Sequence, residues 1–208
     1  MLRRVRSAGT RLLAPVEITG VESKRFRVTV STAQGFDIDA KQVVFCTGYE
    51  MLNLVPVVNH RIASTWVIAT RPQPQRLWPE ECLIWEASEP YLYARTTLDG
   101  RVICGGADAA FSDERRRDAQ LDAKAVVLER KLSALLPTVD ARAAFRWTGS
   151  FGQSSTGLPS IGAVPGYRHG FAVLGYGGNG ITFSMLASEL LVAATSGRRD
   201  PDSSLFAF

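Results

Sequence analysis

A glycine-rich turn that leads directly into an apolar helix pattern constrains this chain more than any other feature. The turn, Gly175-Tyr176-Gly177-Gly178-Asn179-Gly180, has four glycines in six residues. It follows a strand pattern at Phe171–Leu174 and precedes a predicted helix from about Ile181 to Ser196. Bare backbone amides at a helix N-terminus favour an anion or a developing negative charge. The segment therefore indicates either an anion-binding turn or a flexible loop with one left-handed residue.

A second glycine element ends a continuous apolar strand. Val43-Val44-Phe45-Cys46 has no charged residue, and Thr47-Gly48 follows it directly. An unbroken apolar strand is typical of the middle of a parallel sheet that is covered on both faces. A Thr-Gly turn at its carboxyl end lets the backbone approach a ligand closely, although a tight turn explains it equally well.

Most of the remaining chain is predicted to be β-structure. Apolar and polar side chains alternate over residues 26–31 and 36–39, on either side of a turn at Gln34-Gly35. A short amphipathic helix is expected over residues 2–13, and regular apolar spacing predicts a helix from Leu121 to Leu135. Further strands are predicted at Trp66–Thr70, Leu83–Glu86, Tyr91–Thr96, Arg101–Gly105 and Phe145–Phe151, with a hairpin turn at Leu98-Asp99-Gly100.

Composition excludes several classes of protein. The 208 residues are 46% hydrophobic and 21% charged, which is typical of a folded globular chain and excludes disorder. The net charge is only +4, and the densest basic run, Arg115-Arg116-Arg117, is flanked by acids, so no nucleic-acid partner is predicted. No apolar run reaches the ~18 residues of a membrane helix. Pro15 and Glu17 interrupt the basic N-terminal stretch, which favours a surface helix over a signal peptide or an organellar presequence.

Cysteine and histidine usage adds a prediction about location. The chain has three cysteines without CxxC spacing and two histidines. This pattern predicts neither a disulfide framework nor a metal site, and it favours small buried thiols in a reducing, cytoplasmic location. The residues expected in the core on this interpretation are Cys46, Cys82 and Cys104, together with Trp66, Trp85 and Trp147.

The order of these segments resembles a known family. VVFCTG, then PYLYARTTLDGRVICGGAD, then WTGSFGQSSTGLPSIGAVP and FAVLGYGGNGITFS are similar to successive motifs of the FAD-dependent amine and amino-acid oxidoreductases of the D-amino-acid oxidase superfamily. That superfamily includes glycine oxidase, sarcosine oxidase and dimethylglycine dehydrogenase. The ending, Ser203-Ser204-Leu205-Phe206, is similar as well. The resemblance therefore covers almost the whole chain.

The resemblance implies a fold and a reaction. The expected fold class is α/β (α+β): an incomplete FAD-binding Rossmann-like domain with an antiparallel-sheet substrate domain. Residues 1–50 would form the C-terminal part of the first FAD-binding segment, 51–148 the substrate-binding sheet with a helix, and 149–208 the closing FAD-binding segment with the C-terminal helix. The implied reaction is oxidation of a C–N bond of an amine or amino acid by hydride transfer to the flavin. No side chain is assigned as a general base, because an amine that binds neutral needs none.

The resemblance also assigns cofactor contacts. The backbone at Val16 would meet the adenine end of FAD, and Thr47 and Gly48 would lie near its pyrophosphate and ribose. Some relatives carry a covalent flavin on a cysteine where this chain has Gly149, so non-covalent FAD is expected. The residues expected to line the flavin ring are Gly157, Leu158, Gly177, Gly178, Asn179, Gly180 and Ile181.

The substrate would lie under the middle sheet. Tyr91, Tyr93 and Arg95 alternate, so they share one face of a strand, and Tyr176 lies beside the flavin loop. Each aromatic residue is also explained by ordinary packing. Arg95 either binds a substrate carboxylate or pairs with a nearby acid, and a structural pairing with Asp99 or Glu86 is slightly favoured.

Relatives that bind amino acids hold the substrate carboxylate with basic residues. The matching positions here are Phe151, Gly178 and Thr182, none of which is basic. The favoured interpretation is therefore a small-molecule amine substrate without a carboxylate near the reacting carbon. The alternative is an amino acid whose carboxylate is held by Arg95.

One motif of the family is missing. Its members begin with a GxGxxG turn after a first strand, and no such turn precedes VVFCTG here. The chain is therefore expected to be a C-terminal portion, which a partner chain supplying the N-terminal half would complete. The alternative is a non-catalytic remnant or accessory subunit. A nicotinamide-dependent dehydrogenase is disfavoured for lack of a complete dinucleotide fingerprint.

Overall fold

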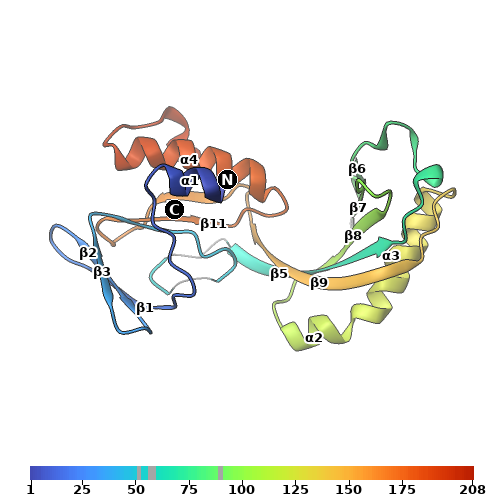
Figure 1. Cartoon of the computed structure of the whole chain (residues 1–208), viewed down its shortest axis with the longest axis horizontal. Coiled ribbons are helices and arrows are strands. Elements are labelled where there is room, and N and C mark those ends of the chain that lie inside the picture. Colours follow the sequence, from blue (N-terminus) through green and yellow to red (C-terminus); the bar gives the residue numbers. More distant parts are fainter. Residues whose placement is uncertain (51–52, 56–59, 89–90) are drawn as a thin grey trace.

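The fold has two parts that share two long strands. The computed structural model describes residues 1–50, 53–55, 60–88 and 91–208. β5 (His60–Thr70) and β9 (Ala143–Ser154) run side by side from one part into the other (Figure 1). The described residues form three sheets with helices packed against them, which confirms the predicted mixed α/β class with an antiparallel substrate sheet.

The part on the right of Figure 1 is a five-stranded antiparallel sheet. Its strand order is β6-β7-β8-β5-β9, with β6 at Ile84–Trp85, β7 at Leu92–Thr96 and β8 at Val102–Ala109. The predicted hairpin joins β7 and β8. Two short 3-10 turns, η1 (Pro74–Arg76) and η2 (Pro79–Glu81), lie between β5 and β6.

Helices cover one face of this sheet. α3 (Leu121–Leu135) has the predicted bounds, and its buried Leu128 and Leu132 pack on Trp66 and Cys104. The short α2 (Glu114–Ala119) precedes it, and the side chain of Asp113 caps its N-terminus by accepting from the Arg116 amide at 2.8 Å. Because side chains alternate along a strand, the neighbours of these core residues point to the other face.

That other face bears several exposed aromatic side chains. Phe145 is 58% exposed and Trp147 is 41% exposed on β9. On this face Tyr93 pairs with Gly105, which pairs in turn with Val67. No helix of the described chain packs here as α3 does on the opposite side (Figure 1). We call this surface the uncovered face.

The other part is built on a small mixed sheet. β11 (Gly170–Leu174) lies between β10 (Ser160–Ala163), which is antiparallel to it, and β4 (Val43–Phe45), which is parallel. α4 (Gly180–Thr195) packs on this sheet through Ala187 and Leu190. The chain ends beside β10, after the 3-10 turn η3 (Pro201–Leu205), and the Ile161 amide donates to the Phe206 carbonyl at 2.7 Å.

A separate three-stranded antiparallel sheet precedes β4. It consists of β1 (Ile18–Ser23), β2 (Val28–Thr32) and β3 (Asp37–Ala40), in that order. The structure confirms the two strands predicted from alternation, β2 and β3, with bounds shifted by one or two residues. β1 was not predicted as a separate strand. Two of its residues are glycine and glutamate, which gives no clear apolar alternation.

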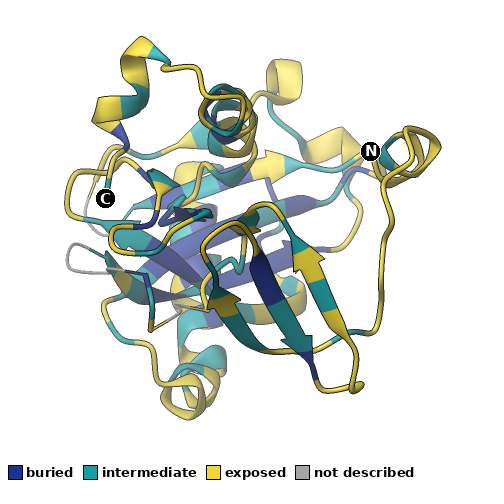
Figure 2. Cartoon of the chain, turned by 90° about the vertical axis from the view of Figure 1, so that its left-hand side faces the viewer, coloured by how far each residue is buried: buried dark blue, intermediate teal, exposed yellow. Residues whose placement is uncertain are grey.

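The predicted helix over residues 2–13 was largely wrong. α1 covers only Leu2–Ser7 and has no buried residue, and Leu12 and Leu13 are 46% and 47% exposed. Figure 2 shows α1, beside the N-terminus, almost entirely in the exposed colour. A helix of this length has little intrinsic stability without a packing surface. The apolar residues do recur at helical spacing, but no described element packs against them.

Three core predictions also need correction. Trp66 is fully buried, but Trp85 is 68% exposed and Trp147 lies on the uncovered face. Of the three thiols only Cys104 is buried, whereas Cys46 and Cys82 are exposed. β4 lies at the edge of its sheet in the described chain, not in the middle, and Val44 is 40% exposed. No helix of the described chain is long and apolar enough to cross a membrane.

Candidate functional site

The two glycine elements meet at one edge of the small sheet. β4 and β11 are parallel, with Phe45 opposite Ala172. The turns that follow them, Thr47-Gly48 and Gly175–Gly180, therefore leave the same edge of the sheet, where ligands bind in open α/β sheets. Burial raises the pKa of Tyr176, and Cys46 and Tyr49 raise it further.

A third turn joins them. Ser160, at the start of β10, pairs with Leu174 at the end of β11, so the preceding Gly157-Leu158 lies beside the start of the glycine-rich turn. The Gly177 amide also donates to the Gly152 carbonyl on β9 at 2.8 Å. The structure thus brings together all the residues predicted to line the flavin ring and the Thr47-Gly48 turn.

The N-terminus of α4 is open. A Cβ atom added at Gly157, Gly177 or Gly178 would have no atom within 4 Å. The side chain of Asn179 makes no capping hydrogen bond, and the backbone amides of residues 178, 180 and 181 donate to no acceptor in the described chain. Ile181 is 93% exposed. Several donors therefore face a space that protein atoms do not fill.

The side chains predicted at the edge of this space are turned toward the backbone. The Tyr176 hydroxyl donates to the Val173 carbonyl at 3.0 Å, and the Thr47 hydroxyl donates to the Glu50 carbonyl at 2.7 Å. These hydroxyls shape the turns, which leaves backbone amides as the groups available to a ligand. Val16 lies in the irregular segment between α1 and β1, and no hydrogen bond of the described chain links it to the three turns.

His60 was missed by the sequence analysis. Its imidazole lies where a Cβ on Gly175 would stand, and both ring nitrogens are buried without a hydrogen-bond partner in the described chain. Burial lowers the pKa of His60. His60 is the first residue of β5, so it links this strand of the five-stranded sheet to the glycine-rich turn. The only signal in the sequence was the scarcity of histidine, which favoured dismissing it.

The predicted substrate residues lie on β7 and just before it. The Tyr93 ring covers Gly105, where a Cβ atom would collide with it. Burial raises the pKa of Tyr93, and the nearby carboxylate of Asp108 raises it further. Tyr91 contacts Trp85 edge to face, with ring centroids 6.1 Å apart. Tyr93 lies on the uncovered face, and Arg95, two residues further along β7, is on the same face, as the alternation predicted.

Arg95 does not make either predicted ion pair. Asp99 pairs with Arg101 at 2.8 Å, and Glu86 lies 3.9 Å from Lys131. Within the described residues, the exposed Arg95 guanidinium donates to the Thr96 carbonyl at 3.5 Å and makes no ion pair. The slightly favoured structural pairing is wrong.

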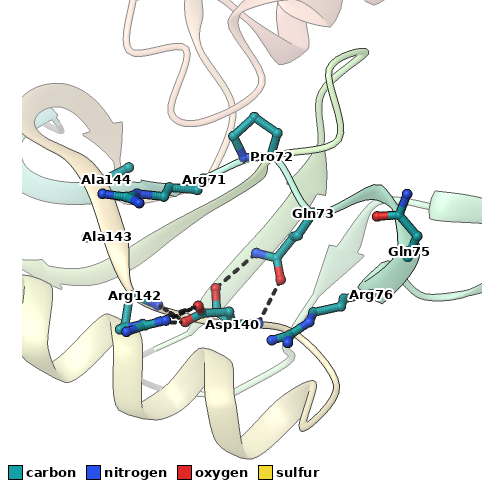
Figure 3. Close-up of a pocket in the computed structure, with 9 residues that line it drawn as sticks. All are labelled: Arg71, Pro72, Gln73, Gln75, Arg76, Asp140, Arg142, Ala143 and Ala144. Carbon is teal, nitrogen blue, oxygen red and sulfur yellow. Dashed lines mark hydrogen bonds and ion pairs between the residues drawn. The ribbon is translucent and has the colours of Figure 1, made fainter.

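A cavity of about 630 Å³ lies at the far end of the five-stranded sheet (Figure 3). Arg71, Arg76 and Arg142 line it. The Arg142 guanidinium and the Asp140 carboxylate pair at 2.6 Å, and the amide of Asp140 donates to the Gln73 side chain at 2.7 Å. None of the residues predicted to bind flavin or substrate lines this cavity. Among its polar side chains, those of Gln73, Asp140 and Arg142 are linked to one another by hydrogen bonds and an ion pair.

Comparison with known proteins identifies the family. A family model described as FAD dependent oxidoreductase matches residues 1–194. The chain belongs to that family, within the D-amino-acid oxidase superfamily. None of the curated proteins gives a match.

Solved structures of several flavoenzymes share the fold. A glycine oxidase from Geobacillus kaustophilus is 19% identical, with a TM-score of 0.76 over 97% of this chain and 54% of its own. An iminodiacetate oxidase from Chelativorans sp. BNC1 is 18% identical, with a TM-score of 0.78 over 99% of this chain and 56% of its own. An L-proline dehydrogenase from P. horikoshii is 14% identical, with a TM-score of 0.72 over 99% and 56%. This family member thus spans little more than half the length of these structures.

The residues of this family member fit the cofactor that the family implies. The open glycines at the three turns leave room for a flat ring against the backbone. The uncapped start of α4 supplies N–H donors and partial positive charge, which suit the electron-rich edge of a flavin. The exposed Ile181 adds an apolar contact for a ring system.

Proposed function

We propose that this chain is the C-terminal, flavin- and substrate-binding portion of an enzyme that oxidises a C–N bond of an amine or amino acid. The meeting of three open turns at the N-terminus of α4 carries this proposal. It supports a cofactor edge that is held by backbone amides. Bound FAD supplies the hydride acceptor, so the tasks left to the protein are to orient the substrate, exclude water and stabilise charge.

Each group has a defined task in this proposal. The amides of Gly178, Gly180 and Ile181 stabilise negative charge on the ring that they face. Tyr91 and Tyr93 form an apolar wall for the substrate on the uncovered face, and Tyr176 fixes the glycine-rich turn by its bond to Val173. Gly149 offers no side-chain nucleophile, so FAD binds non-covalently. The cytoplasmic location and the absence of a nucleic-acid partner remain predictions.

Exposed apolar side chains on β4 and α4 support the proposal that a further segment packs against them. β4 has no strand on its outer side in the described chain, and Val44 is exposed there. Ile181 and Met185 on α4 are 93% and 63% exposed. An unpaired apolar edge invites another strand. We propose that a segment carrying the first glycine turn pairs with β4, either as a partner chain or as an upstream part of the same protein.

A second candidate follows from the same observation. A chain that spans about half of the solved relatives would act as a non-catalytic accessory subunit if the missing half were never supplied. The pyrophosphate of FAD normally rests on the first glycine turn, so FAD binding by this chain alone is expected to be weak.

FAD titration tests the proposal. Quenching of protein fluorescence by FAD should be weak but saturable for the purified chain. Gly180→Val should abolish it, because a branched side chain would fill the open space at α4. Gly20→Val in β1 is the matched control, since it adds the same side chain far from the turns. Equal quenching in both variants would contradict the assignment.

A further inference from the structure

The Arg71–Arg142 cavity holds more positive charge than its own side chains neutralise. Three guanidinium groups and one carboxylate line this cavity of about 630 Å³, which leaves an excess of two positive charges (Figure 3). The guanidiniums come from three segments, because Arg71 follows β5, Arg76 ends η1 and Arg142 precedes β9. A hollow lined by one sign of charge concentrates ions of the opposite sign.

Two of these three guanidiniums are available to a ligand. Arg142 is engaged with the Asp140 carboxylate, to which its Nε donates at 2.9 Å and its Nη2 at 2.6 Å. Within the described residues, the side chains of Arg71 and Arg76 make no hydrogen bond or ion pair. Each guanidinium carries five N–H donors, so two complete sets of donors border the cavity.

Hydrogen bonds hold the walls of the cavity together without these two arginines. The Gln73 side chain donates to the Asp140 carbonyl at 2.9 Å and accepts from the Asp140 amide at 2.7 Å. The Gln73 amide donates to the Gly100 carbonyl at 2.8 Å, which ties the segment before η1 to the hairpin between β7 and β8. A site whose backbone is fixed in advance loses less entropy when it binds a ligand.

The β9 wall of the cavity contains a β-bulge. Phe145 pairs with Ala69 and Ala143 pairs with Thr70, so Ala144 has no partner on β5. Ala143 and Ala144 both line the cavity, and their small side chains leave room in it. Bulges are frequent at sheet edges and beside binding sites, and β9 is the edge strand of this sheet.

The chemistry of the lining favours a phosphoryl group over other anions. A planar carboxylate occupies one guanidinium fork, as Asp140 does with Arg142. A phosphoryl group has three outward oxygens and accepts from guanidiniums that approach from different directions. No aromatic ring lines the cavity in the described chain, so the lining offers no surface on which a base or flavin ring would stack.

We propose that the Arg71–Arg142 cavity binds a phosphorylated small molecule through its phosphoryl group. Arg71 and Arg76 donate to the phosphoryl oxygens, and Arg142 stays paired with Asp140 at the edge of the site. The ligand neutralises the excess of positive charge in the cavity. This site is separate from the start of α4, and the proposal does not rest on the proposed oxidoreductase function.

Calorimetric titration of the full chain with pyrophosphate, at pH 7.5 and a constant ionic strength of about 0.15 M, tests the site. We expect saturable binding that Arg71→Gln and Arg76→Gln each weaken about 10- to 100-fold, as for loss of a charged hydrogen-bond partner. Arg199→Gln removes the same charge from the exposed segment after α4 and should leave the affinity unchanged. Succinate, a dicarboxylate of similar charge, should bind more weakly than pyrophosphate.

A variant with the opposite expected effect keeps the test independent of folding. Asp140→Asn removes the one carboxylate of the cavity and frees the Arg142 guanidinium, so pyrophosphate should bind more tightly, by about 10-fold. Asp37→Asn, on exposed β3, removes the same charge elsewhere and should change nothing. Because Arg71 and Arg76 are exposed, their variants should unfold at the temperature of the wild type.

Nuclear magnetic resonance of the ¹⁵N-labelled chain locates the bound pyrophosphate. The amide signals of Gln73 and Ala144 should shift saturably. Saturable shifts at residues 178–181 instead would place the anion at the start of α4, and the cavity proposal would be overturned. It would also be overturned by an absence of saturable binding, by an equal loss in Arg199→Gln, by unchanged affinity in Asp140→Asn, or by succinate binding as tightly as pyrophosphate.

Discussion

The imidazole of His60 lies directly against the α-carbon of Gly175 and occupies the place of a side chain. This contact joins the first residue of β5 to the glycine-rich turn before α4. It makes the position of that turn depend on a strand that comes more than a hundred residues earlier in the chain.

Gly175→Ala should therefore destabilise the protein in two ways. Its φ of +74° disfavours any side chain by about 1–2 kcal/mol, and the new methyl group would overpack His60 at a cost of about 1–3 kcal/mol. Gly197→Ala, at a φ of +71° with open space around it, should lose only the first amount. Urea unfolding of the two variants gives the comparison. In a His60→Ala background the cost of Gly175→Ala should fall to that of Gly197→Ala, and an unchanged cost would contradict the contact.

Stability should depend on pH through His60. Burial lowers its pKa below the ordinary 6.5, so the folded state binds fewer protons than the unfolded state near that pH. The stabilisation from neutral His60 is full above pH 6.5 and is lost as the pH falls below it. His60→Gln should flatten the unfolding temperature between pH 7 and 5.

The Asp140–Arg142 pair should shift acid stability. Hydrogen bonds from Arg142 lower the pKa of Asp140 to about 2. The folded pKa is depressed, so the stabilisation is full above the unfolded value near 4 and is lost as the pH falls toward 2. In Arg142→Ala the pKa of Asp140, followed by NMR of its carboxyl carbon, should rise toward 4. A value still near 2 would show that other groups hold it.

Asp108 should control the ionisation of Tyr93. Its negative charge raises the pKa of Tyr93, so Asp108→Asn should lower that pKa toward the ordinary value of 10. Ultraviolet titration of the variant against a Tyr93→Phe reference isolates this hydroxyl. If the Tyr93 pKa does not move, the carboxylate is not beside the ring.

Local sequence patterns predicted the helices that pack against a sheet. They did not predict features that depend on which strands pair with one another. α3 was predicted to the residue because its apolar spacing faces a real core at Leu128 and Leu132. The same kind of pattern failed for α1, which buries no residue against the described part of the chain. Glycine turns could be found in the sequence, but their meeting depends on the parallel pairing of β4 with β11, which no local signal specifies.

The β8 bulge and His60 were missed because their roles depend on residues that are distant in the sequence. Gly105 was predicted as the end of a strand, yet β8 continues past it. Gly106 has a φ of +134° and precedes a β-bulge, in which Ala107 and Asp108 stand opposite Thr65. A bulge depends on the register of two partners, so the sequence of one strand cannot locate it. His60 needs Gly175 opposite it, and these residues are brought together only by the tertiary fold.

Nuclear magnetic resonance of the ¹⁵N-labelled chain during FAD titration tests the central claim most directly. If the open start of α4 holds the flavin, the amide signals of Gly178, Gly180 and Ile181 should shift progressively and saturably, while those of Gly20 and of α3 stay in place. Shifts confined to the Arg71–Arg142 cavity, or no saturable shift at the three amides, would contradict the account.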